Sequence, residues 1–223
     1  NKYMKPVTKP LSKIKTTWSP NLAYAIGLIT TDGNLSKDGR HMDFTSKDKE
    51  QILNFMHCLG IKNKISLKHS GFANTQCFRI QFGDVNFYKF LLKIGLTPKK
   101  SKTLSSLNIP NKYFFDFLRG HFDGDGTFYS FWDKRWKSSF MFYVVFISAS
   151  KAHIEWLRQK ISNNLKIHGH ITQDGEKRSY QLKYAKKESL KLIKKLYYSE
   201  NNVYLPRKYL KIQKALAIIG TTL

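Results

Sequence analysis

Two short apolar stretches share one pattern of apolar and polar positions. Residues 25–33 read AIGLITTDG, and residues 118–126 read LRGHFDGDG. Both place glycine third and Asp-Gly at the eighth and ninth positions. Ser19-Pro20 precedes the first stretch and provides a helix N-cap followed by proline at the first helical position. The pattern predicts two similar helices, each ending at its Asp-Gly pair.

Three further pairs of segments match in the same order along the chain. Ser46-Lys47 and Ser150-Lys151 each open a run of apolar residues with helical spacing, with serine before the first turn. Residues 78–82 (FRIQF) and 180–184 (YQLKY) alternate with period two, as strands do. Residues 96–100 (LTPKK) match 204–208 (YLPRK). Ordered matches of this kind predict a duplicated structure.

The expected fold is α+β, with pseudo-twofold duplicated αββαββα halves and antiparallel sheets. We expect an N-terminal basic arm (1–18), a first half (19–98), a linker (99–110) and a second half (111–223). The arm is either a contact to nucleic acid or a disordered end. Expected strands are 42–45, 64–68, 77–82, 127–136, 140–148, 167–172 and 179–184, with later helices at 85–94, 186–196 and 206–219.

The charge of the chain narrows its partners. The 223 residues include 39 Lys+Arg and 15 Asp+Glu, for a formal net charge of +24. A polyanion would relieve this self-repulsion, so DNA and RNA are the leading candidates. A membrane surface is the weaker candidate, because the basic residues are spread along the chain and no apolar run approaches about 20 residues.

Cysteine and histidine offer no zinc site. Cys58 and Cys77 are the only cysteines, too few for a disulfide framework or a structural zinc site. We expect two buried thiols in a reducing, intracellular compartment. His168 and His170 should share one strand face without a cysteine nearby. We interpret both histidines as groove-facing or surface residues.

The glycines predict where the two motif helices meet. Glycine inside a helix costs about 1 kcal/mol relative to alanine. Gly27 and Gly120 would offset this cost by letting the helices cross closely. Asp32 and Asp125 would then emerge together at the centre of the molecule. The following glycines, Gly33 and Gly126, would allow the sharp exit of a helix end.

Two adjacent carboxylates at helix C-termini oppose both the helix dipole and each other. A divalent cation would remove this penalty, and hard oxygen ligands suit Mg²⁺. We therefore expect two or three Mg²⁺ ions shared between the halves. Asp32 and Asp125 would bind them, and the backbone carbonyls of Thr31 and Gly124 would be extra ligands. The alternative is that each Asp-Gly merely ends a helix.

These residues resemble the LAGLIDADG homing endonucleases over nearly the whole chain beyond Trp18. The second motif is the more specific, because the first has Thr30-Thr31 where the name-giving sequence has Asp-Ala. In the family the acid at the eighth position binds metal, which implies this role for Asp32 and Asp125. At the sixth position Asp123 is expected to be a capping residue.

The resemblance also implies two pairs of polar site residues. Lys100 and Lys208 match the basic residue that follows the last helix of each repeat, where a lysine would offset charge on the phosphate. The alternative is that they are solvated lysines. Ser46 and Ser150 align with a polar, water-ordering position, although N-capping suits serine better.

In the family two sheets form a saddle over DNA, so the polar residues of alternating strands would face the bases. The expected DNA-binding residues are His41, Asp43, Thr45, Lys64, Ser66, Lys68, Arg79, Gln81, His168, His170, Gln181 and Lys183. A long aromatic hairpin could stack on bases, but we expect its rings to pack on the sheet. These are Phe128, Tyr129, Phe131, Trp132 and Trp136.

The resemblance implies a monomeric, metal-dependent endonuclease that makes a staggered double-strand break at a long asymmetric DNA target. The alternative on the same fold binds nucleic acid without cutting it, as an intron maturase acting on RNA or as a regulator. A third class is a membrane-surface or structural protein. No flanking splicing domain is visible, which favours an intron-encoded or free-standing gene. The Lys, Asn and Ile bias favours AT-rich coding DNA of an organelle, phage or bacterium.

Overall fold

The computed structural model describes residues 12–69, 76–136, 138–175 and 179–222. The first half contains α1 (Pro20–Asp32), β1 (Gly33–Leu35), β2 (His41–Ser46), α2 (Lys49–Leu59), β3 (Ser66–His69), β4 (Gln76–Gly83) and α3 (Val85–Lys93). The second half contains a 3-10 turn, η1 (Asn111–Tyr113), then α4 (Phe114–Asp125), β5 (Thr127–Trp132), β6 (Phe140–Ser148), α5 (Lys151–Leu165), β7 (His170–Gln173), β8 (Tyr180–Ala185), α6 (Lys186–Leu196) and α7 (Pro206–Ile218).

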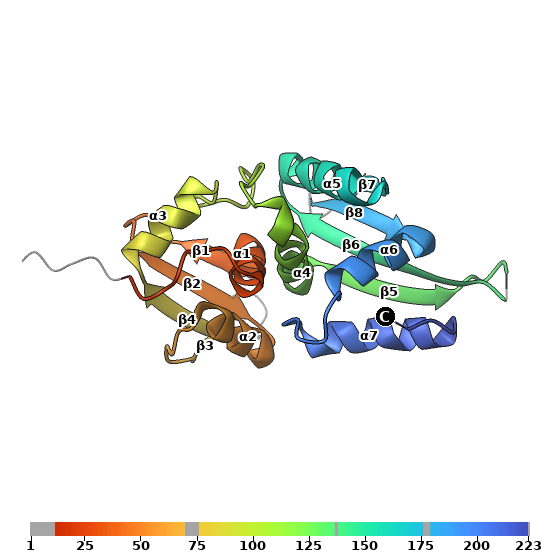
Figure 1. Cartoon of the computed structure of the whole chain (residues 1–223), viewed down its shortest axis with the longest axis horizontal. Helices are drawn as coiled ribbons and strands as arrows, with labels where there is room; N and C mark the ends of the chain where they lie inside the picture. Colours follow the sequence, from red (N-terminus) through yellow and green to blue (C-terminus); the bar gives the residue numbers. More distant parts are fainter. Residues whose placement is uncertain (1–11, 70–75, 137, 176–178, 223) are drawn as a thin grey trace, which may run out of the picture.

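The strand order is the same in both halves. The first sheet runs β1-β2-β4-β3 and the second β5-β6-β8-β7, with antiparallel pairing between the neighbouring strands. Helices α1 and α4 lie side by side in the middle of the molecule, between the two sheets (Figure 1). The structure confirms the expected α+β fold with duplicated halves. The final helix α7 extends the second half beyond the shared pattern.

The two central helices cross at the predicted glycines. A Cβ on Gly120 would collide with the Tyr24 carbonyl oxygen and lie 3.2 Å from the Cα of Gly27. A Cβ on Gly27 would lie 2.6 Å from the backbone nitrogen of His121. Any larger residue therefore has to push the two backbones apart, because the atoms it meets belong to the main chain.

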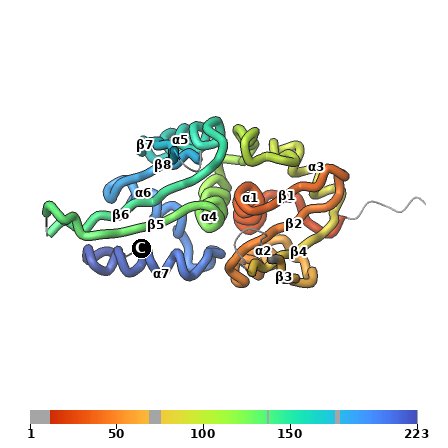
Figure 2. Tube along the Cα trace, turned by 180° about the vertical axis from the view of Figure 1, so that it is seen from behind, coloured from red at the N-terminus to blue at the C-terminus, as the bar shows by residue number. Residues whose placement is uncertain are grey.

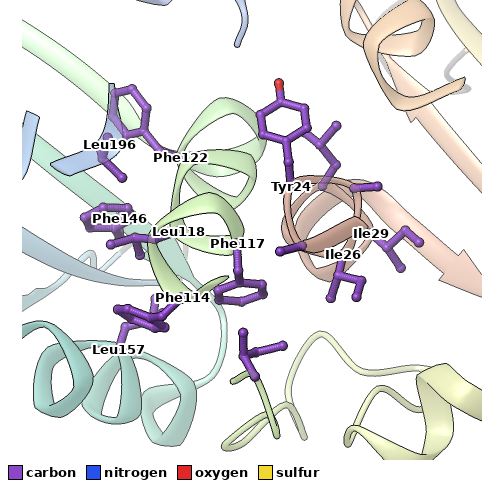
Figure 3. Packing of buried hydrophobic residues seen from close by; sticks show 14 of the residues in the cluster. Tyr24, Ile26, Ile29, Phe114, Phe117, Leu118, Phe122, Phe146, Leu157 and Leu196 are labelled. Atoms are coloured by element: carbon purple, nitrogen blue, oxygen red, sulfur yellow. The ribbon is translucent and has the colours of Figure 1, made fainter. Parts of the chain in front are cut away.

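Apolar residues on both sides of this crossing form one core. Figure 3 shows Tyr24, Ile26 and Ile29 on α1 and Phe117 and Phe122 on α4, all buried. Phe44 of the first sheet and Phe146 of the second are also fully buried. Because α1 is buried on nearly every side, its sequence is apolar almost throughout.

Strand register reveals the true repeat and corrects one sequence match. The β2–β4 ladder ends at Ser46–Phe78, and the β6–β8 ladder ends at Ser148–Tyr180. Ser46 is therefore equivalent to Ser148, not to Ser150. In both halves that serine Oγ accepts a hydrogen bond at 3.1 Å from the backbone N–H two residues later.

The two expected serine N-caps have different outcomes. Ser150 is the N-cap of α5, where its side chain accepts from the His153 backbone N–H. For Ser46 the prediction was wrong, because Ser46 is the last residue of β2 and Asp48 occupies the N-cap position of α2. The Ser46 hydroxyl instead donates to Oε1 of Gln51 at 2.7 Å.

The long aromatic hairpin also differs from expectation. Strand β5 ends at Trp132, not near Trp136, because a turn closed by the Asp133 N–H and the Ser139 carbonyl follows it. Phe128 packs in the core, as expected. Tyr129 and Phe131 stack with Tyr143 of β6, and Trp132 contacts Phe140, as expected, although these three rings stay 40–53% exposed. Trp136 is 69% exposed. The hairpin extends past α7, as both views show (Figures 1 and 2).

Most of the expected N-terminal arm lies outside the described residues. In its described part, Ile14 is buried, and the backbone N–H groups of Lys13 and Ile14 donate to Oδ2 of Asp84 at 2.7 and 3.0 Å. In the segment between α3 and η1, Leu104, Leu107 and Ile109 are buried. Within the described residues, no helix is long and apolar enough to cross a membrane.

Candidate active site

The acids of the two motifs meet where α1 and α4 end. Asp32 is the last residue of α1, and Asp125 is the last residue of α4. The two ends touch: a Cβ on Gly124 would lie 3.1 Å from Asp32 Oδ2 and would collide with the Thr31 hydroxyl. Burial, followed by repulsion from Asp125, raises the pKa of Asp32 to about 7. Burial also raises the pKa of Asp125.

Two buried lysines accompany the acids, Lys100 from the linker after the first half and Lys208 from the second half. Lys100 and Lys208 are each only 6% exposed, so neither is the solvated lysine that the sequence left as an alternative. Lys100 Nζ donates to the Gly33 carbonyl oxygen. Burial lowers the pKa of both ammonium groups to about 8, and this effect outweighs the opposing attraction of the carboxylates.

Lys208 closes the end of α4. Its Nζ donates to the carbonyl oxygens of Phe122 at 2.6 Å, Asp123 at 2.8 Å, Gly124 at 3.2 Å and Gly126 at 2.6 Å. These carbonyls lie at or just beyond the helix C-terminus, where α-helices leave acceptors unpaired and favour positive charge. The lysine therefore stabilises the helix end that carries Asp125.

Asp123 positions Lys208 rather than capping its own helix. Its Oδ2 accepts from the Tyr24 hydroxyl and from the Leu205 backbone N–H, both at 2.8 Å. Leu205 is the N-cap residue of α7, and Lys208 lies in the first turn of that helix. In the first motif the equivalent position is Thr30, whose hydroxyl donates a hydrogen bond of 2.7 Å to the Ile26 carbonyl oxygen of its own helix. The capping role expected for Asp123 thus applies to the start of α7.

The glycines after the acids are needed for space, not for a left-handed turn. Gly33 and Gly126 have φ values of −87° and −72°, which any residue adopts. The sharp exit expected at each helix end is present, because β1 and β5 follow the helices directly. A Cβ on Gly33 would lie 2.7 Å from the Ile29 Cα, and one on Gly126 would lie 2.6 Å from the Phe122 carbonyl oxygen. The chain turns directly into β1 and β5 against its own helix.

The donor set limits what could bind here. Within the described residues, no group of three or more His, Cys, Asp or Glu side chains could hold a metal ion. The two carboxylates remain, with backbone carbonyls near them, and Gly124 O already accepts the longest of the four Lys208 bonds. Mg²⁺ is commonly held by one or two carboxylates plus waters and substrate phosphates. The half-buried Asp32, whose charge Asp125 repels, and the more exposed Asp125 beside it fit such an ion.

A cavity of about 380 Å³ opens beside Asp32. Arg207 and Asp48 flank it and form an ion pair of 2.7 Å between the two halves. Gln51 also lines the cavity and is 3% exposed, and its amide nitrogen has no hydrogen-bond partner among the described residues. These three residues were not among the predicted site residues, because nothing in local spacing reveals a cavity shared by both halves.

The expected DNA-binding residues of the first half lie mainly on the sheet face away from the core. Arg79 pairs with Thr45 and Ser66 on this face, and Gln81 pairs with Asp43. Asp43 holds Arg79 in an ion pair of 3.2 Å. The remaining three expected residues of the first half are His41, Lys68 and Lys64. The Nδ1 of His41 lies 2.6 Å from Oδ2 of Asp38. Lys68 lies on β3, and Lys64 precedes that strand.

In the second half three of the four expected residues share the equivalent face. Gln181 and Lys183 lie on β8, and His170 pairs with Lys183. His168 does not share a strand face with His170, so that expectation was wrong. Gly169 between them has φ +54°, which breaks the alternation of an extended strand, and His168 lies against Ser162 of α5 at 3.2 Å.

The sequence matches no protein-family model and no curated protein. Solved structures do match. The I-LtrWI LAGLIDADG homing endonuclease bound to target DNA has a TM-score of 0.61 and 12% identity, covering 90% of this chain and 91% of that one. The homing endonuclease I-WcaI bound to its DNA recognition sequence has a TM-score of 0.60 and 16% identity, covering 94% and 95%. The chain has the LAGLIDADG fold.

Two other LAGLIDADG structures also match. The N-terminal LAGLIDADG domain of DUF199/WhiA has a TM-score of 0.53 and 16% identity, covering 80% of this chain and 82% of that one. I-DmoI, described in complex with DNA and Mn, has a TM-score of 0.53 and 18% identity, covering 81% and 98%. At these identities the likeness establishes the fold alone.

Proposed function

We propose that the chain is a site-specific endonuclease that makes a metal-dependent, staggered double-strand break in DNA at a long asymmetric target. The observation that carries the proposal is the meeting of Asp32 and Asp125 at two touching helix ends, with Lys100 and Lys208 buried beside them. The first half and the linker after it thus contribute one acid and one lysine, and the second half contributes the other pair. The similar solved structures that contain bound DNA support the same assignment.

Each of these residues has a distinct task. Asp32 and Asp125, with the carbonyls of Thr31 and Gly124, would hold two or three Mg²⁺ ions shared between the halves. Bound Mg²⁺ would activate water and stabilise the leaving oxygen of the phosphodiester. Lys100 and Lys208, mostly protonated at pH 7, add positive charge where negative charge develops on the phosphate.

Double-stranded DNA is the proposed partner, bound by one monomer. Both halves of the site lie in one chain, so no second copy is required. The open sheet faces would read bases, and many of the other basic residues would contact phosphates. Because the halves differ in sequence, the two half-sites would differ as well. With a net charge of +24, log affinity should fall with log salt as for at least roughly six phosphate contacts, at about −0.9 per contact.

A second candidate is a nucleic-acid-binding protein that does not cut, either a regulator or a maturase acting on RNA. The match to the LAGLIDADG domain of WhiA, a protein not described as an endonuclease, favours it. The presence of both acids favours the nuclease, since a protein that only binds has no need of a half-buried carboxylate, Asp32, held beside a second one, Asp125.

Selection from a randomised duplex library separates the two functions. Incubation with Mg²⁺ should enrich cut products of one asymmetric sequence, and incubation with Ca²⁺ should enrich the same sequence as an uncut complex. Enrichment in the bound fraction without any cut product in Mg²⁺ would instead establish the non-cutting function. A structured RNA library, run in parallel, identifies a maturase by tighter binding to RNA than to the duplexes.

A further inference from the structure

The open faces of the two sheets differ in chemistry although their registers coincide. In the first sheet the open-face pairs of β2 and β4 are His41–Gly83, Asp43–Gln81 and Thr45–Arg79. The equivalent pairs of β6 and β8 are Tyr143–Ala185, Val145–Lys183 and Ile147–Gln181. All three polar side chains of β2 are thus replaced by an aromatic or aliphatic one on β6, of which Val145 is only 1% exposed and Tyr143 and Ile147 are half-buried.

Three aromatic rings extend this apolar face along the hairpin. Tyr129 of β5 pairs with Tyr143 of the neighbouring strand β6, and Phe131 follows two residues later on β5. Their rings are nearly parallel, with interplanar angles of 5–17° and centroids 5.2–6.3 Å apart. Tyr129 and Phe131 are 40% and 42% exposed. We call these three residues the aromatic ladder.

The ladder lies outside the hydrophobic core. Helices α4, α5 and α6 contact β6, whose Phe140, Phe142 and Phe146 are buried on the opposite face, and α7 contacts β5. Figure 1 shows α6 crossing β5 and β6, and the reverse view of Figure 2 brings these strands to the near side. Clustered, exposed aromatic residues of this kind mark a surface that binds something.

The position of the ladder indicates what it binds. Strand β5 leaves directly from the candidate active site, so Tyr129 and Phe131 lie four and six residues beyond Asp125. At about 3.3 Å per residue, they lie about 13 and 20 Å along the strand. This corresponds to about four and six base pairs of a duplex, at about 3.4 Å per nucleotide of each strand.

Duplex DNA offers one apolar feature in its major groove, the 5-methyl group of thymine. Phe131 has no hydrogen-bonding side-chain atom and can recognise only such a feature. We infer that the aromatic ladder reads thymine methyl groups in the half-site bound by the second half, whereas the first sheet reads hydrogen-bonding base edges. The inference rests on duplex DNA being the partner in the proposed function, but it does not require cleavage.

Replacing thymine by uracil in the duplex tests whether the methyl groups are recognised, because uracil differs from thymine only by the missing methyl group. The probes are alternating dA·dT and dA·dU duplexes of about 40 base pairs, bound in Ca²⁺ at fixed salt. Each buried methyl should change affinity about three- to fourfold. Two contacted methyl groups would make the wild-type chain bind the thymine duplex about tenfold more tightly.

A variant carrying both Tyr129→Ser and Phe131→Ser should bind the two duplexes equally and remain folded at the assay temperature, since both rings lie outside the core. The matched control carries Leu53→Ser and Leu210→Ser, which remove two exposed apolar side chains from α2 and α7 and should keep the thymine preference.

Equal binding of both duplexes by the wild type, or a thymine preference that survives in the ladder variant, overturns the inference. Tighter binding to single-stranded dT and dU oligonucleotides, lost in the ladder variant, overturns it in favour of stacking on unpaired bases. Failure to bind either duplex overturns it together with the DNA assignment. A ladder-dependent thymine preference in a chain that cuts no library in Mg²⁺ upholds it and refutes the nuclease alone.

Discussion

Lys208 Nζ lies 2.6 Å from the carbonyl oxygen of Gly126 and donates a hydrogen bond to it. The same ammonium group bonds three further carbonyls of α4. Lys100, its counterpart, bonds only the Gly33 carbonyl among the hydrogen bonds of the described residues. The two lysines are similarly buried, but Lys208 has the larger structural role.

Lys208→Met should therefore destabilise the protein more than Lys100→Met. Hydrogen bonds to a charged group contribute about 1.5–3 kcal/mol each, and the loss of several at one helix end should lower the free energy of unfolding by about 3 kcal/mol or more. Lys100→Met should cost about half of this and still slow DNA cleavage at least about tenfold. Chemical denaturation of both variants measures the difference, and equal losses would contradict the assigned roles.

Asp32→Asn and Asp125→Asn should each abolish double-strand cleavage while leaving DNA affinity in Ca²⁺ within about threefold of wild type. Metal-free Asp32→Asn should also be more stable at pH 8, by on the order of 1 kcal/mol, because it removes one of two repelling, partly buried charges. Glu200→Gln is the control for an exposed acid. Wild-type cutting rates in either Asp variant would refute the site.

Gly27→Leu or Gly120→Leu should prevent folding or inactivate the protein, because the added side chain meets backbone atoms of the facing helix. Gly120→Ala should already lower the melting temperature, since the Tyr24 carbonyl cannot move without the whole of α1. Gly175→Ala is the matched control, because a Cβ there meets nothing within 4 Å. Wild-type melting of Gly120→Ala would show that the helices do not depend on this close approach.

Two stacked histidines should make stability fall in acid. His121 and His153 lie with ring centroids 5.2 Å apart, His153 Nδ1 bonds the Ser105 carbonyl, and Trp156 stacks on His153. Burial lowers the pKa of His153 to about 4 and that of His121 well below its usual value. Protonation of either imidazole therefore favours the unfolded state, in which the charged ring is solvated.

Above about pH 6.5 both histidines are neutral in the folded and unfolded states, and the free energy of unfolding is at its maximum with respect to them. As the pH falls from 6.5 toward 4, the free energy of unfolding should decrease by roughly 3 kcal/mol because of His153. His153→Phe keeps the stacking and should flatten this pH dependence. Urea denaturation at pH 7, 6, 5 and 4 measures it. The same slope in wild type and variant would show that His153 does not titrate on unfolding.

Arg79→Ala should relax base preference at one or two adjacent positions in the half-site bound by the first half. Asp43 orients the guanidinium through the 3.2 Å ion pair, and a bidentate contact to guanine discriminates by about 1–3 kcal/mol. Asp43→Asn should broaden the same positions more weakly. Lys183→Ala should affect only the other half-site. A library profile of each variant tests this, and an evenly weakened but unchanged profile would make Arg79 a phosphate contact.

The sequence by itself determined the duplication, the crossing of the motif helices and the meeting of the acids. These follow from short-range spacing: Gly27 and Gly120 stand at matched positions, and the Asp-Gly pairs follow each at a fixed distance. A helix converts such spacing directly into a face and an end. The alternation of β4 and β8 likewise predicted which face Arg79 and Gln181 occupy.

Only the tertiary structure decided the roles that depend on what covers a residue. In the sequence nothing distinguishes Lys208 from the other lysines. In the structure, α7 places its ammonium group against the carbonyls at the C-terminal end of α4. The Arg207–Asp48 pair and the cavity lined by Gln51 exist because residues far apart in sequence pack together. The exposure of Tyr129 and Phe131 also depends on packing. Alternation places both rings on one face of β5, and only the tertiary structure shows that they stay 40–42% exposed there.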